Sequence, residues 1–333
     1  MGGLADRRAL STKRIKELRE FLKDAEVLAG TKACVYATGS LGRLEASTYS
    51  DLDLFIVGKA NGRKGPDGKE GSQLNRLDEI CIKADLIEAT RKLDFPEFSG
   101  EGRYLVHYPI DDLTKTLGKP EDDVTNTFTA RLLLLLESRP LLGEEAYSDI
   151  LKEVIAPYWR DYEDHKNNFI PAFLANDILR LWRTFCVNYE AGTERMPEDK
   201  KAKGKLKNYK LKHSRMLTCY SALLFLLATF SRRQTVSPAD VLELVRHTPT
   251  ERLEWLAKQD DLIDARPTLE ALLGQYEKFL ETTNAPEDEL LKQFEDKQKS
   301  SELMDASYKF GDLMFESLSC LGGNNRFHRL MIV

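Results

Sequence analysis

Two aspartates, Asp51 and Asp53, are the residues of this chain whose types and spacing point most directly to chemistry. Asp51 precedes and Asp53 lies within the largely apolar run at residues 52–57, which is typical of a β-strand. Side chains two apart along a strand leave the same face, with Cα atoms about 6.6 Å apart. Because hard cations prefer oxygen ligands, two carboxylates that converge in this way predict a site for divalent metal.

A Gly-Ser turn, Gly39-Ser40, precedes the aspartates and follows another short apolar run. If it opens a helix, its unpaired N–H groups and the Ser40 hydroxyl can receive phosphate oxygens. Neither motif is specific alone, since most Asp-x-Asp pairs are solvated residues at strand edges or in turns. The ordered combination of strand, Gly-Ser turn and Asp-x-Asp at a second strand is specific. It predicts a site that binds phosphate and metal together.

The elements that must position these residues can be read from hydrophobic spacing. Apolar residues at helical spacing predict helices over residues 11–29 and 73–93. Runs of β-forming residues predict strands at 33–37, 52–57 and 103–108, and the glycine-rich segment 58–72 is expected to be a hairpin or connector. Beyond about residue 121 the spacing is helical almost to the end. We therefore expect an α+β fold, with a mixed sheet and flanking helices in domain 1–120 and an all-α domain at 121–333.

One strongly basic segment, residues 200–215, contains seven lysines and one arginine and no acid. We interpret residues 200–207 as a solvated, flexible connector. Lys212 and Ser214 adjoin the apolar helix expected over 215–230, which must pack into a core, so we expect these two residues to be held in place. The segment leaves the rest of the chain more acidic than the average suggests, which allows a short anionic ligand near it.

Composition narrows the class of protein. The chain has 333 residues, 42% hydrophobic and 31% charged, with a formal net charge of −5. These values favour a soluble, two-domain protein that does not coat long duplex nucleic acid. No apolar run is long enough to predict a membrane span, and the N-terminus lacks the pattern of a secretory signal, so we expect a cytoplasmic protein. The five cysteines and five histidines are scattered, which gives no support to a zinc site or to a Ser-His-Asp hydrolase.

The motif resembles a known superfamily. Gly39-Ser40 followed by Asp51-Leu52-Asp53 is similar to the signature of the DNA polymerase β-type nucleotidyltransferases. The fuller pattern, Gly-Ser-Leu-Gly-Arg-x-Glu at 39–45 and Tyr-Ser-Asp-Leu-Asp-Leu at 49–54, resembles the catalytic domain of bacterial PII-protein uridylyltransferases and related proteins. The resemblance covers roughly residues 33–143. It implies transfer of a nucleoside monophosphate from a nucleoside triphosphate to an acceptor hydroxyl, with release of pyrophosphate.

The resemblance also implies roles for particular residues. Asp51 and Asp53 would be the catalytic metal ligands and would hold two Mg²⁺ ions, or Mn²⁺ in their place. Gly39, Ser40 and Arg43 would bind the nucleotide. From the helical half, Lys212 and Ser214 would lie over the β- and γ-phosphates.

One expected residue is missing from the pattern. Enzymes of the superfamily usually present a third carboxylate on a neighbouring strand, and residues 103–108 contain none. Asp94, Glu97 and Glu101, which precede that strand, are the candidates.

The sequence allows two kinds of acceptor for the nucleoside monophosphate. The acceptor is either a nucleotide or oligonucleotide, as in bacterial antiviral enzymes that make nucleotide signals, or a side-chain hydroxyl of a partner protein. A non-enzymatic regulatory module that binds nucleotide in the same cleft is the alternative.

Overall fold

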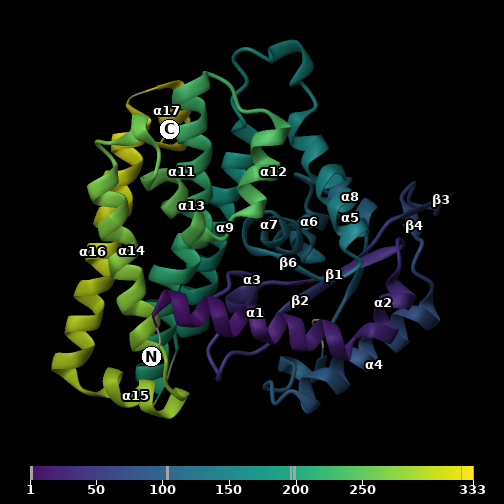
Figure 1. Cartoon of the computed structure of the whole chain (residues 1–333), viewed down its shortest axis with the longest axis horizontal. Coiled ribbons are helices and arrows are strands. Elements are labelled where there is room, and N and C mark those ends of the chain that lie inside the picture. The colour runs from purple at the N-terminus through teal and green to yellow at the C-terminus, as the bar shows by residue number, and fades with distance from the viewer. Residues whose placement is uncertain (1–2, 103–104, 196, 198–199, 324, 333) are drawn as a thin grey trace. The chain divides into compact units, whose positions relative to one another are not determined.

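The computed structural model describes residues 3–102, 105–195, 197, 200–323 and 325–332. The chain divides into two compact units (Figure 1), of which one is Leu4–Arg160 and the other is Asp161–Val333 together with Met1–Gly3. We call them the sheet unit and the helical unit and describe each by itself.

The sheet unit is built on four strands, in the order β5–β2–β1–β6. Their bounds are β1 (Ala33–Ala37), β2 (Leu54–Gly58), β5 (His107–Pro109) and β6 (Arg139–Leu142). Strand β1 is antiparallel to both β2 and β6, whereas β2 is parallel to β5. This mixed sheet confirms the expected fold class. The segment at 58–72 forms a separate two-stranded hairpin, β3 (Ala60–Lys64) and β4 (Glu70–Ser72).

Helices cover both faces of the sheet, as alternation along β1 requires. Val35 packs into a buried cluster with residues of β2, α1, α2 and α4. The side chain of the neighbouring Tyr36 points to the opposite face of the sheet. The Tyr36 hydroxyl donates to the carbonyl oxygen of Ala130 at 3.0 Å, and its ring centroid lies 6.4 Å from that of Tyr147 on α8. The helices of this unit are α1 (Leu4–Phe21), α2 (Lys23–Ala29), α3 (Gly39–Gly42), α4 (Arg76–Lys92), α5 (Ile110–Thr114), α6 (Glu121–Val124), α7 (Thr127–Glu137) and α8 (Glu144–Ile155), with short 3-10 turns η1 (Ser99–Gly102) and η2 (Ala156–Trp159).

Two boundaries differ from the sequence expectation. The helix expected over 11–29 begins at Leu4 and is divided at Leu22 into α1 and α2. The sheet unit extends to Arg160, so the domain boundary expected at 120 falls between α5 and α6. The physical reason is that β6 pairs with β1 and completes the sheet. An apolar helix such as α7 gives no sign in the sequence that a further strand follows it.

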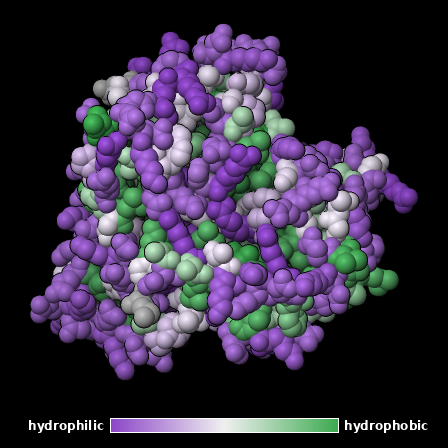
Figure 2. All heavy atoms as spheres, viewed as in Figure 1, coloured by the Kyte–Doolittle hydropathy of each residue, from purple (hydrophilic) through white to green (hydrophobic). Residues whose placement is uncertain are grey.

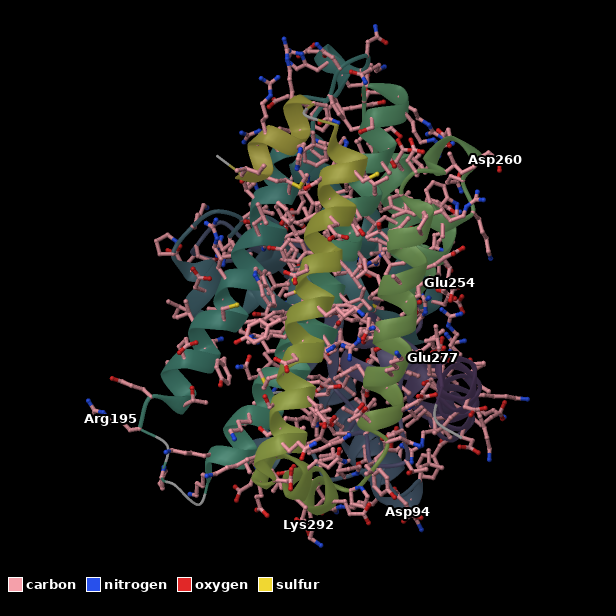
Figure 3. All side chains as sticks on the ribbon, turned by 90° about the vertical axis from the view of Figure 1, so that its left-hand side faces the viewer. Asp94, Arg195, Glu254, Asp260, Glu277 and Lys292 are labelled. Carbon is pink, nitrogen blue, oxygen red and sulfur yellow. The ribbon has the colours of Figure 1, made fainter. Side chains whose placement is uncertain are left out.

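The helical unit contains α9 (Ala172–Thr193), α10 (Lys201–Lys210), α11 (Met216–Arg233), α12 (Pro238–Arg246), α13 (Pro249–Ala257), α14 (Arg266–Thr282), α15 (Glu287–Glu295), α16 (Lys297–Gly322) and α17 (Arg326–Ile332), with 3-10 turns η3 (Glu163–His165) and η6 (Asp260–Leu262). Helix α16 packs along α14 (Figure 3). A π-helical turn, Leu211–Arg215, joins α10 to α11 and makes Lys201–Arg233 one continuous helix.

The basic segment at 200–207 is therefore helical, and the interpretation as a flexible connector is wrong. Leu206 and Tyr209 are buried, whereas Lys203 is exposed and pairs with Glu287 at 2.7 Å. In the sequence the frequent lysines suggest a solvated segment, but Leu206 and Tyr209 lie about one helical turn apart and form a buried apolar face.

Helix Lys201–Arg233 is the one stretch of the described chain whose length and hydropathy would allow it to cross a membrane, yet 78% of its apolar window is buried inside the structure. Such burial is typical of a core helix. On the face drawn in Figure 2, hydrophobic residues form small groups among hydrophilic ones.

His213, in the π-helical turn, predicts a pH-dependent stability. Its ring stacks on Phe279 at 4.7 Å between centroids, its Nδ1–H donates to the Tyr209 carbonyl oxygen at 2.9 Å, and burial lowers its pKa to about 4. The unfolded chain, with an ordinary pKa near 6.5, takes up the proton first. Stability is therefore complete above about pH 6.5 and falls as the pH falls toward 4.

Between pH 7 and 5 we expect this histidine to cost about 2 kcal/mol of unfolding free energy. The measurement is urea unfolding of the full chain and of His213→Phe at both pH values. The variant should lose about 2 kcal/mol less than the parent, whereas replacing the exposed His165 by glutamine should leave the difference unchanged. Equal losses in the parent and His213→Phe would show that this histidine is not the cause.

Candidate active site

The two aspartates lie immediately before β2 rather than inside it, because β2 begins at Leu54. The expected alternation nevertheless holds, since Leu52 and Leu54 are buried and Asp51 and Asp53 are exposed. The backbone still follows β1 at this point, where the Thr38 N–H donates to the Asp53 carbonyl oxygen at 2.8 Å. Both carboxylates therefore leave the chain on its solvent side.

The Gly-Ser turn lies directly against the second aspartate. Gly39 has a φ of +63°, and a Cβ built on it would lie 2.6 Å from Oδ2 of Asp53. Glycine is required here for two reasons, because other residues rarely adopt this φ and because a side chain would displace the carboxylate. The structure thus brings together Gly39 and Asp53, which are fourteen residues apart in the sequence.

This contact predicts that Gly39→Ala impairs the site. We expect nucleotidyl transfer to fall on the order of tenfold, because the added methyl group shifts Asp53 from its position. Gly62→Ala is the matched control, since Gly62 also has a positive φ, +75°, but nothing within 4 Å of its Cβ position. Steady-state rates of both variants test this, and equal losses would mean that backbone strain alone is responsible.

Behind the turn, Arg43 is enclosed by two carboxylates. Its Nε donates to Glu45 Oε2 at 2.8 Å and its Nη1 donates to Glu137 Oε2 at 2.9 Å. The other oxygen of Glu137, Oε1, accepts the Gly39 N–H at 3.0 Å. The Arg43 side chain is only 7% exposed. Arg43 therefore supports the turn, and a contact between Arg43 and the nucleotide stays a prediction.

Glu137 is a residue that the sequence analysis missed. It ends α7, where the negative end of the helix dipole disfavours a carboxylate. The positive charge of Arg43 and the Gly39 N–H offset that cost. A second close approach comes from its backbone, because a Cβ on Gly42 would lie 2.0 Å from the Glu137 carbonyl oxygen. No local pattern links residues 39–43 to 137, so only the fold reveals this support.

The remaining nucleotide-binding candidates lie in different places. Ser40 is half-buried within α3, beside Gly39. Lys212 and Ser214 belong to the π-helical turn of the helical unit. There the Lys212 Nζ lies 4.0 Å from the ring centroid of Tyr308, and the Ser214 hydroxyl donates to the Lys210 carbonyl oxygen at 2.8 Å. Their place over a triphosphate stays a prediction.

The candidates for a third carboxylate precede β5 and are exposed. Asp94, with its side chain at the periphery in Figure 3, follows α4; Glu97 pairs with Arg91 at 3.5 Å; and Glu101 lies in η1. Arg103 and Tyr104, at the start of the expected strand, lie outside the described residues. Among the residues that are described, no three His, Cys, Asp or Glu side chains are grouped so that they could hold a metal ion. The role of Asp51 and Asp53 as metal ligands stays a prediction.

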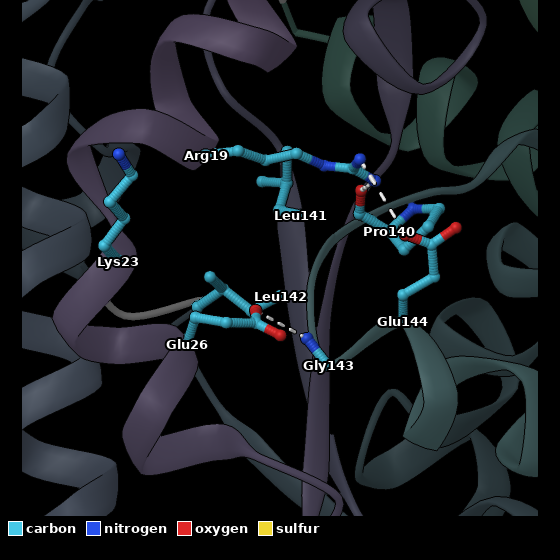
Figure 4. A pocket seen from close by; sticks show the side chains of 8 residues that line it. All are labelled: Arg19, Lys23, Glu26, Pro140, Leu141, Leu142, Gly143 and Glu144. Atoms are coloured by element: carbon cyan, nitrogen blue, oxygen red, sulfur yellow. Dashed lines mark hydrogen bonds and ion pairs between the residues drawn. The ribbon is translucent and has the colours of Figure 1, made fainter.

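A small pocket of about 270 Å³ lies elsewhere in the sheet unit, between the α1–α2 region and the β6–α8 junction (Figure 4). Across it Arg19 Nη2 donates to the Pro140 carbonyl oxygen at 2.7 Å, and the Gly143 N–H donates to Glu26 Oε2 at 2.9 Å. These bonds join the helices to β6. The pocket contains none of the predicted site residues, so we read it as a packing feature.

Comparison with known proteins agrees with the geometry. Residues 15–131 match the family model of the nucleotidyltransferase domain. The matched segment includes the Gly-Ser turn and both aspartates and ends within α7, so it takes in less than half of the chain. It supports the polymerase β-like superfamily and nucleotidyl transfer in general. No curated protein and no solved structure matches the chain.

Proposed function

We propose that this protein transfers a nucleoside monophosphate from a nucleoside triphosphate to an acceptor hydroxyl and releases pyrophosphate. The observation that supports the proposal is the closeness of the Gly39 turn to the Asp53 carboxylate. In the proposal this turn binds phosphate and this side chain binds metal.

The donor set fits divalent metal. Asp51 and Asp53 offer exposed carboxylate oxygens on one side of the chain, which is the ligand type that Mg²⁺ and Mn²⁺ prefer. Bound Mg²⁺, with Mn²⁺ as the substitute, would neutralise charge on the phosphates and act as a Lewis acid. The aspartates hold that charge in place, and the Gly39 turn, fixed by Glu137 and Arg43, orients the triphosphate.

Phosphate binding falls to the turn and to the basic π-helical turn. Ser40 supplies a hydroxyl at the start of α3, and we propose that Lys212 and Ser214 bind the β- and γ-phosphates. In this proposal Lys212 leaves the ring of Tyr308 for a phosphate, which is the stronger partner because both groups are charged.

A base must accept the proton of the attacking hydroxyl. Strand β5 is parallel to β2 and begins with His107 opposite Ile56, which is three positions beyond Asp53 in the sequence. Glu101 is the candidate closest to β5 in the sequence, and we retain it for this role. Otherwise Asp53 or solvent would accept the proton.

The acceptor is a nucleotide or oligonucleotide, as in nucleotide signalling for antiviral defence, or a side chain of a partner protein such as a PII-like protein. Incubating the full chain with each α-labelled NTP or dNTP and Mg²⁺ tests the proposal through pyrophosphate release. Separating the products by size distinguishes a labelled protein from a short oligonucleotide.

A second candidate function follows from the incomplete carboxylate set. A chain with two metal-binding aspartates and no third carboxylate grouped with them among its described residues could bind nucleotide without turning it over. Saturable nucleotide binding without pyrophosphate release, for every nucleotide tested, would favour this regulatory module and overturn the enzymatic proposal.

A further inference from the structure

Three residues that are far apart in the sequence form a hydrogen-bonded relay at the end of β2 remote from the aspartates. The Ser72 Oγ lies 2.9 Å from His107 Nε2, and His107 Nδ1 lies 3.2 Å from Glu79 Oε2. They come from the ends of three elements, β4, β5 and the first turn of α4. Gly58 closes the site from β2, because a Cβ there would lie 1.9 Å from the Ser72 Oγ.

The surrounding bonds select one arrangement of protons. Ionised Glu79 can only accept, so His107 Nδ1 carries the hydrogen and Nε2 is left as an acceptor. The Leu74 N–H donates to the Ser72 Oγ at 3.0 Å, which leaves the Ser72 hydroxyl hydrogen to point at Nε2. This is the order nucleophile, base and orienting carboxylate that activates a serine.

Burial and charge favour the neutral histidine that such a base requires. Partial burial lowers the pKa of His107 below its ordinary value, although Glu79 acts in the opposite direction. Burial acts to raise the pKa of Glu79, but the bonds and charges of Lys83 and His107 outweigh it and leave that pKa lowered. The other charges near the relay are Arg76, 3.9 Å from Glu79, and Asp112 of α5. His107 therefore stays unprotonated at neutral pH.

We propose that Ser72 is the nucleophile of a second reactive site, which accepts the acyl group of a small carboxylic ester. Ser72 is partly exposed, so a reagent can reach its Oγ, whereas the His107 side chain is only 8% exposed. Gly58 lies so close to the Ser72 Oγ that a Cβ on it would not fit, which favours a short acyl group over a large one. The scattered histidines of the sequence give no support to a Ser-His-Asp hydrolase, and this arrangement becomes visible only in the fold.

The reaction balances with these groups and water alone. The Ser72 Oγ bonds to the carbonyl carbon and its proton passes to His107 Nε2. The carbon–oxygen bond to the alcohol then breaks, and the alcohol leaves with the proton from Nε2. Water attacks the acyl-serine with His107 again as base, which releases the acid and restores Ser72.

The relay is separate from the nucleotidyltransferase site. Gly58 is five residues beyond Asp53 along β2, a distance of roughly 16 Å in an extended strand. The inference therefore does not depend on the proposed function. A chain with Asp51 and Asp53 both replaced by asparagine should keep the reactivity of Ser72.

The test is covalent labelling of the full chain with a small alkyl fluorophosphonate, followed by intact mass and peptide mapping. We expect one adduct, located at Ser72, with fluoride as the leaving group. Ser72→Ala should abolish the adduct, and His107→Gln should slow its formation at least about a hundredfold, since a general base contributes about 10²–10⁴. The rate of 4-nitrophenyl acetate hydrolysis should be highest for the parent, lower for His107→Gln and absent for Ser72→Ala.

Ser148→Ala, at an exposed serine of α8, is the matched control and should label at the parent rate. A thermal transition for each variant confirms that it is folded. If the relay only supports the hairpin, His107→Gln lowers the transition temperature but labels at the parent rate. That result, or the lack of an adduct at Ser72 in the parent chain, overturns the proposal.

Discussion

Replacing Asp53 by asparagine is expected to lower nucleotidyl transfer at least about 10³-fold, with little change in stability. The rate should fall because an amide cannot hold a divalent cation as a carboxylate does, and Lewis-acid stabilisation is worth several kcal/mol, or about tenfold for each 1.36 kcal/mol. Asp51→Asn should have an effect of the same kind. The folded state should survive both changes, since removing one of two clustered negative charges relieves repulsion.

The control for this experiment is Asp24→Asn, which removes an exposed carboxylate from α2 of the same unit. Pyrophosphate release by the control should equal that of the parent. A thermal transition of Asp53→Asn at or above the parent value would show that the loss is local. Full activity in the Asp51, Asp53 double asparagine variant would contradict the assignment of the site, whatever the metal added.

The turn and the aspartates could be predicted because the signal is local. Gly39 follows β1 and Asp53 precedes β2, and these two strands are antiparallel neighbours, so the hydrophobic runs that place β1 beside β2 also place the turn beside Asp53. The short connection between the two strands favours that pairing. For the same reason the fold class and strands β1 and β2 were predictable, while β6 and the exact strand ends were not.

Residues that support the site from a distance could not be predicted. Glu137 accepts a hydrogen bond from the Gly39 N–H, 98 residues away in the sequence. His107 is hydrogen-bonded to Glu79 and Ser72, which are 28 and 35 residues away. Neither a helical nor a strand period encodes such contacts, because they depend on which elements become neighbours. In the sequence Glu137 is one acid at the end of an apolar helix, and its function appears only when β6 brings α7 to the turn.

The helical structure of the basic segment, residues 200–215, was not predicted from its composition. Its charge density favours a solvated connector, but two buried side chains, Leu206 and Tyr209, are enough to fix it as a helix. The π-helical turn that follows, with Lys212 and Ser214, has no sequence signature. Such turns occur often at functional sites, which agrees with the proposed phosphate contact.

Replacing Glu137 by glutamine is expected to weaken both the site and the sheet unit. Its carboxylate accepts from the Gly39 N–H and from Arg43 at once, and its side chain is fully buried. The amide keeps at most one of these bonds and turns an N–H₂ group toward another donor. Removing one partner of a buried ion pair costs about 3–5 kcal/mol, and since Glu45 still pairs with Arg43 we expect the lower end, about 3 kcal/mol.

We expect the Glu137→Gln variant also to lose nucleotidyl-transfer activity, separately from its loss of stability, because Glu137 positions the Gly39 turn. With the Gly39 turn no longer fixed, we expect kcat/KM for the nucleoside triphosphate to fall about tenfold at a temperature well below the unfolding transition, mainly through KM. Glu88→Gln, at an exposed acid of α4, should change neither quantity. Glu137→Asp keeps the charge but cannot reach both donors, so it should fall between the parent and the glutamine variant. A stability loss with unchanged KM and kcat would show that Glu137 only holds the fold, whereas a KM effect that follows the order parent, aspartate, glutamine identifies the turn as the part of the site that it positions.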